Sequence, residues 1–313
     1  MKRVSIAVYG FNIQNDQNQM LDLNSFEEVG LSEVFESFMK DNANKYENIS
    51  RKEKVFKAED WNIFNVLDEN KRQRYLFMIG KIKTGGYGMS SEIINPETSE
   101  TNYEKGVGEA EVLPFYFCLA IPADHATRGI LILQTIGVYS MKSVFEHMFE
   151  KKLKLYNSNH QFITGNLAPR QYIENYMQNG ILQRIHLVQY ERPVNRDERL
   201  EVDFHCKAKE LVIHKPVGFI TQKREIISGY LTGRRTLTDI IMINDFEFQE
   251  LKMDFTKGKR TKTINLSNLS KLAITEDITG AISFEGEFPS KESMMEALKS
   301  VAEDYMISMG TIA

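Results

Sequence analysis

Four cations fall within six residues in the segment Lys257-Gly-Lys-Arg-Thr-Lys262. Lysine and arginine side chains gathered in this way neutralise the phosphates of a nucleic acid. The glycine lets the chain turn, so that the charged side chains project together. The segment therefore predicts a phosphate-binding surface. The alternative is an edge hairpin that its charges keep soluble.

Charge is unevenly distributed along the chain. The formal net charge is −4, yet residues 205–275 contain 13 Lys and Arg against 7 Asp and Glu, whereas residues 14–50 contain 2 against 8. A basic region on an acidic protein indicates a polyanionic partner bound at one face, and we expect DNA ahead of RNA. The predicted nucleic-acid-binding residues are Lys223, Arg224, Arg234, Arg235, Lys257, Lys259, Arg260 and Lys262.

One arrangement has the residue types of a nuclease. Asp239 or Asp245 precedes Glu250-Leu-Lys252, and many metal-dependent nucleases place an acid on one strand and an acid-x-lysine on the next. The two carboxylates would hold magnesium, and the lysine would orient the attacking water. On a solvated strand face, the same Glu250 and Lys252 are an ion pair. A divergent nuclease is therefore the alternative function, and a non-enzymatic protein is the first expectation.

Other chemistries find no support in the sequence. The glycine-rich run at residues 84–88 lacks the lysine and hydroxyl order of a phosphate-binding loop. His205 and Cys206 are adjacent, and neighbouring strand residues point to opposite faces, which disfavours chelation of one ion. No G-x-S-x-G nucleophile elbow occurs. We therefore predict no catalytic residue, no metal site and no cofactor.

The spacing of apolar residues predicts the helices and strands that position these side chains. Apolar residues predict helices at residues 31–39, 140–154, 169–179 and from residue 290 onward, with Ser32 and Ser140 as caps. They predict strands at residues 4–11, 61–67, 74–80, 112–121, 129–137, 181–190, 199–211, 239–244 and 246–255. Residues 84–108 are expected to form a surface loop, and helical periodicity is weak between residues 216 and 238. The fold class is α+β, with mixed or antiparallel sheets and packed helices in two halves, residues 1–155 and 156–313.

A cytoplasmic location is expected. The N-terminal apolar run is too short for a signal peptide, and no apolar stretch is long enough to span a membrane. Cys118 and Cys206 lie far apart in apolar surroundings, which is typical of buried, reduced thiols. The methionine-rich helix after Pro289 predicts a core face or a self-association surface.

The order of these elements resembles that of the RexA-type phage-exclusion proteins and other bacterial anti-phage accessory proteins. The resemblance rests on a strand pair at residues 115–121 and 129–135, a helix containing Phe145, and a second half with a strand at residues 200–205 and a basic stretch. It implies a cytoplasmic, DNA-binding homodimer that acts in antiviral defence with a second defence protein. No functional residue is carried over. A third possibility is a scaffold whose acidic N-terminal half binds a basic partner.

Overall fold

The computed structural model describes residues 3–308 of the 313-residue chain, apart from residues 27, 68, 125, 138, 167–169, 191–207 and 268–273. Within this part, a 13-stranded sheet forms the framework, and its strand pairs are antiparallel. From one edge to the other, the strands are β12 (Ala208–His214), β11 (Ile181–Tyr190), β13 (Glu250–Lys257), β14 (Arg260–Asn265), β15 (Ile274–Asp277), β1 (Val4–Gln14), β8 (Gly129–Ile136), β7 (Glu111–Pro122), β4 (Gln73–Gly86), β3 (Lys54–Leu67) and β2 (Glu47–Ile49). Two short strands extend it, β10 (Gln161–Asn166) beside β1 and β9 (Tyr139–Ser140) beside β8.

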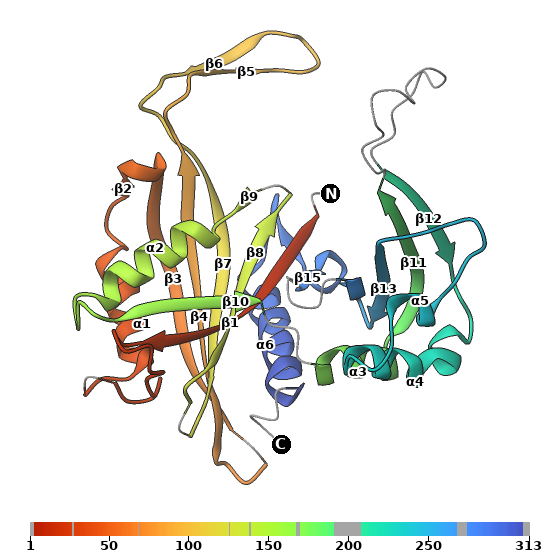
Figure 1. Cartoon of the computed structure of the whole chain (residues 1–313). Coiled ribbons are helices and arrows are strands. Elements are labelled where there is room, and N and C mark those ends of the chain that lie inside the picture. Colours follow the sequence, from red (N-terminus) through yellow and green to blue (C-terminus); the bar gives the residue numbers. More distant parts are fainter. Residues whose placement is uncertain are drawn as a thin grey trace.

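The N-terminal strand β1 lies in the middle of this sheet, between β8 and the C-terminal strand β15 (Figure 1). One edge of β1 pairs with β8. The opposite edge is shared, because Ser5 to Val8 pair with β15 and Tyr9 to Gln14 pair with β10. The sheet is therefore continuous through both predicted halves, and the division at residue 155 stays a prediction.

Six α-helices in the described residues cover the sheet: α1 (Leu31–Asp41), α2 (Lys142–Leu153), α3 (Arg170–Asn179), α4 (Phe219–Leu231), α5 (Leu237–Ile240) and α6 (Lys291–Ser308). The buried apolar residues form two hydrophobic cores, and successive residues of β7 alternate between them. Phe115 and Phe117 pack with α1 and α2, whereas Tyr116 and Cys118 pack in the core that contains α6 and α3. The near-continuous apolar run at residues 112–121 is typical of a strand that is covered on both faces.

The remaining elements are short. Residues Ser91–Ile94 (β5) and Thr101–Lys105 (β6) form a hairpin that extends away from the sheet (Figure 1). Strands β16 (Phe284–Glu285) and β17 (Phe288–Pro289) pair just before α6, and 3₁₀ turns occupy Ser50–Lys52 and Thr279–Ala281. No helix in the described residues is long and apolar enough to cross a membrane.

The α+β class is confirmed, but several local expectations are wrong. Helix α1 starts after Gly30 without a side-chain cap, so Ser32 does not have the predicted capping role. The expected loop at 84–108 contains the β5–β6 hairpin, and α5 occupies part of the strand expected at 239–244. Helix α4 lies where helical periodicity is weak. Cys118 is buried and free, as expected, whereas the pair His205-Cys206 lies outside the described residues.

Candidate nucleic-acid interface

The basic segment forms the hairpin of β13 and β14, as the sequence suggested. Lys257 pairs with Arg260 across a two-residue loop, Gly258-Lys259. Gly258 has a φ of 59°, a backbone conformation that favours glycine and suits a tight hairpin loop. The loop projects Lys259 into solvent. The other three cations of the segment, Lys257, Arg260 and Lys262, are less exposed than Lys259.

Three of the four cations in this hairpin face acids of the same protein. Lys257 and Arg260 both pair with Asp304 on α6, with 3.3 Å between Lys257 Nζ and Asp304 Oδ1. Lys262 pairs with Glu276 on β15. The expectation that all four side chains gather on the surface is therefore wrong. Lys262 is only 1% exposed, so a phosphate cannot reach it in this structure.

The burial of Lys262 follows from strand alternation. Lys262, Ile264 and Leu266 are buried and share one side of the chain, while Thr261 and Thr263 are exposed. The Nζ atom of Lys262 donates a hydrogen bond to the hydroxyl of Tyr305 at 3.1 Å. Burial lowers the pKa of Lys262 to about 7, although the carboxylate of Glu276 acts in the opposite direction. The alternation with Ile264 and Leu266 was the sequence pattern that could have revealed this side chain as internal.

Arg260 stays charged beside them. Its burial disfavours the cation, but the carboxylates of Glu276 and Asp304 outweigh that cost and raise the pKa of Arg260. The pairs of Arg260, Lys257 and Lys262 together tie the hairpin to β15 and α6. These residues form an internal charge network, and that network is structural.

A second group of predicted residues does gather on the surface, where α4 ends. Gly233 has a φ of 74° and reverses the chain after the helix. The N–H of Gly233 donates to Tyr230 O at 2.9 Å, and the N–H of Arg234 donates to Gly229 O at 2.8 Å. These two bonds are the Schellman arrangement that satisfies the last carbonyls of a helix. It folds Arg234 and Arg235 back toward the helix that precedes them.

The reversal creates an open hollow of about 690 Å³ lined by Arg224, Arg234 and Arg235 together with Glu225, Ile226, Ser228 and Gly229. We call it the arginine hollow. A Cβ at Gly229 would lie 2.8 Å from Cγ of Arg235, so the missing side chain gives the arginine room against the helix. Arg234 donates from Nε to the hydroxyl of Thr232. Lys223 is half-buried and does not line the hollow.

The arginine hollow differs from the hairpin in its charge balance. All three arginines are exposed, and no ion pair with another described residue engages them. Glu225 is one acid at its rim, and Glu174 on α3 accepts a hydrogen bond from Ser228 at 3.4 Å. Among the residues that line the hollow, three arginines outnumber one glutamate, and Asp239 lies near enough to Arg235 to interact with it electrostatically. The arginines were predicted from the sequence, whereas Ser228 and Gly229 were not, because their positions in the hollow depend on helix α4.

The residues of the nuclease alternative have other roles. Asp239 accepts hydrogen bonds from the backbone and the hydroxyl of Thr236, which caps α5 and lowers the pKa of Asp239. Glu250 pairs with Lys252 at 2.7 Å, and that hydrogen bond lowers the pKa of Glu250. Asp245 adopts a turn conformation with a φ of 61°. Among the described residues, no group of three or more His, Cys, Asp or Glu side chains could hold a metal ion.

Comparison with known proteins adds no assignment, since no family model and no curated protein matches this chain.

Proposed function

We propose that this protein binds nucleic acid, DNA in the first instance, through the arginine hollow formed by Arg224, Arg234 and Arg235. The observation that carries the proposal is that these three cations line one open hollow without an ion pair in the described part of the chain. Lys259 adds an exposed cation on the β13–β14 loop. Lys257, Arg260 and Lys262 are not part of the proposed surface, because acids of the protein already neutralise them.

Arginine suits this role for a geometric reason. Its planar guanidinium donates two parallel hydrogen bonds to one phosphate, and it keeps its charge at every physiological pH. Contacts of this kind position a duplex without reading its bases, so the binding should depend weakly on sequence. Three phosphate contacts correspond to a slope of roughly −2.7 when log affinity is plotted against log salt concentration.

The proposal is tested by measuring the affinity for a fluorescent duplex between 50 and 200 mM salt. A variant with Arg224, Arg234 and Arg235 changed to Gln should bind more weakly, and its salt slope should be shallower by about 2 to 3. The matched control changes Lys71, Lys151 and Lys299 to Gln, which removes the same charge from exposed positions elsewhere. Equal losses in both variants would mean that only net charge matters. A wild-type protein that binds no duplex at 50 mM salt would overturn the proposal and favour a scaffold that binds a basic partner.

The biological setting that we propose is bacterial anti-phage defence, in which the protein acts as a cytoplasmic homodimeric sensor or accessory factor with a second defence protein. Its support is the resemblance in the order of strands and helices to RexA-type phage-exclusion proteins. Survival of phage-infected cells that carry the wild type or the arginine variant tests this setting separately from DNA binding.

A further inference from the structure

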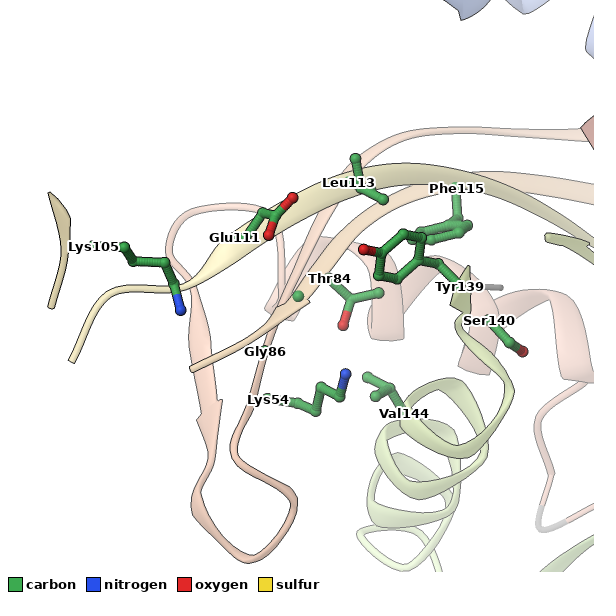
Figure 2. A pocket seen from close by; sticks show the side chains of 11 residues that line it. Lys54, Thr84, Gly86, Lys105, Glu111, Leu113, Phe115, Tyr139, Ser140 and Val144 are labelled. Atoms are coloured by element: carbon green, nitrogen blue, oxygen red, sulfur yellow. The ribbon is translucent and has the colours of Figure 1, made fainter. Parts of the chain in front are cut away.

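A pocket of about 190 Å³ lies in the other part of the sheet, where β3 begins, β4 ends and α2 starts. Figure 2 shows Lys54, Thr84 and Gly86 on one side of the pocket and Tyr139, Ser140 and Val144 on the other. Leu113 and Phe115 contribute apolar surface from β7. The pocket is unconnected with the arginine hollow, which lies beside the opposite edge of the sheet.

Two glycines shape this pocket. Gly85 lies so close to β7 that a Cβ there would come within 1.7 Å of the carbonyl oxygen of Glu111. Gly86 pairs with Lys54 across β3 and β4, and a Cβ at Gly86 would lie 3.5 Å from Lys54 Nζ. That distance is an ordinary contact, so Gly86 lies directly beside the ammonium of Lys54, which is between Gly86 and Val144 in Figure 2.

Lys54 is the cation that this pocket offers to a ligand. No described carboxylate forms an ion pair with it. The second cation, Lys105, donates one hydrogen bond to the carbonyl oxygen of Met89 at 2.9 Å. Glu111 is the one acid among the lining residues, so the lining carries a positive charge overall. A half-buried ammonium without an ion-pair partner among the described residues can pair with a single anionic group.

A largely apolar hollow lies next to the pocket. It has a volume of about 510 Å³ and shares Glu111, Leu113 and Tyr139 with the pocket. Ile136, Phe288 and Pro289 extend its apolar lining toward the start of α6. A ligand with its charged end at Lys54 therefore has apolar surface available beside that end. Small-molecule sites combine apolar walls with a few polar groups in this way.

We propose that this pocket and its neighbouring hollow bind a small amphipathic anion. The phosphate, sulfonate or carboxylate of the ligand pairs with Lys54, and its flat apolar body lies against Leu113 and Tyr139. This function is independent of nucleic-acid binding, because it uses neither the arginine hollow nor the β13–β14 hairpin.

The test uses two fluorescent probes with similar bodies, 8-anilinonaphthalene-1-sulfonate, which is an anion, and N-phenyl-1-naphthylamine, which is uncharged. The wild type should bind one sulfonate per chain. Lys54→Gln should weaken sulfonate binding about five- to tenfold, because the charge-assisted contact is lost. It should change binding of the uncharged probe less than about twofold. Lys209→Gln, on the far edge strand β12, is the matched control and should leave both affinities unchanged.

A second variant tests the apolar half of the site. Tyr139 is 53% exposed, so Tyr139→Ser should fold normally, and it should weaken binding of both probes. The proposal is overturned if the sulfonate does not bind, if Lys54→Gln leaves its affinity unchanged, or if that variant weakens both probes equally. Thermal unfolding of each variant confirms that the protein under test is folded.

Discussion

Lys262 on β14 and Glu276 on β15 lie directly opposite each other and form an ion pair that the protein buries completely, with 3.6 Å between Nζ and Oε1. The pair has aromatic neighbours. The ammonium of Lys262 lies 4.6 Å from the ring centroid of Tyr176 and 5.2 Å from that of Tyr305. A basic segment that looks like a binding surface in the sequence is thus anchored inside the protein.

Removing the acid should destabilise the protein. Glu276→Gln leaves Lys262 and Arg260 without their shared carboxylate, and breaking a buried pair from one side costs about 3 kcal/mol. Urea unfolding at pH 6.5 measures the change in the free energy of unfolding. Glu247→Gln, at an exposed position, should stay within about 0.5 kcal/mol of the wild type. A loss no larger than that of the control would contradict the structural role of the network.

The same network predicts how stability depends on pH. Burial lowers the pKa of Lys262 to about 7, below the 10.5 of an unfolded lysine, so the unfolded state binds more protons between these values. The wild type should therefore gain stability relative to Lys262→Met as pH rises from about 7 toward 10, by at most about 1.4 kcal/mol per pH unit. Below pH 7 the difference between the two proteins should be constant. Urea unfolding of both proteins at pH 6, 7.5 and 9 measures it, and a pH-independent difference would contradict a lowered pKa.

Truncation of Arg260 should destabilise the protein much more than truncation of its neighbour Lys259. Arg260→Ala removes the partner of Asp304 and Glu276 and should cost about 2 to 4 kcal/mol in the free energy of unfolding. Lys259→Ala removes an exposed side chain and should change it by less than about 0.5 kcal/mol. Chemical denaturation of the two variants side by side makes the comparison. Equal losses of stability in the two variants would contradict a buried role for Arg260 and indicate that both side chains lie on a solvated surface.

Helix α6 should tolerate change on one face only. Leu298 is fully buried and Ile307 is 48% exposed on the same helix. Leu298→Ala should cost about 2 to 5 kcal/mol, because it opens a cavity in the core shared with β7 and β8. Ile307→Ala should cost less than about 1 kcal/mol. Deletion of the chain after Pro289 should give insoluble protein, and a soluble truncated protein of unchanged oligomeric state would contradict a core role for α6.

We expect no nuclease activity. The carboxylate of Asp239 caps α5 and that of Glu250 holds Lys252, so neither is free to bind magnesium beside the other. Purified protein should leave plasmid DNA and single-stranded RNA intact in magnesium or manganese. Cleavage that disappears in a folded Glu250→Gln variant would contradict this expectation and support the nuclease alternative.

The sequence by itself determined the α+β class and the elements with the strongest apolar patterns. The continuous apolar run at residues 115–121 predicted a strand, in which the neighbours Phe117 and Cys118 lie in different cores, and the helical stripe after Pro289 located α6 correctly. These patterns are readable because side-chain direction in a strand or helix repeats every few residues. The arginines of the hollow were also identified by type.

Only the tertiary structure decided which cations stay available. The partners of the hairpin cations, Glu276 and Asp304, come from β15 and α6, and no local period relates them to residues 257–262. The arginine hollow depends in the same way on the reversal at Gly233, which follows a helix with weak periodicity. Charge can be counted along the chain, but its neutralisation depends on contacts between distant segments. The fold therefore decided that Lys262 is internal and that Arg224, Arg234 and Arg235 face solvent.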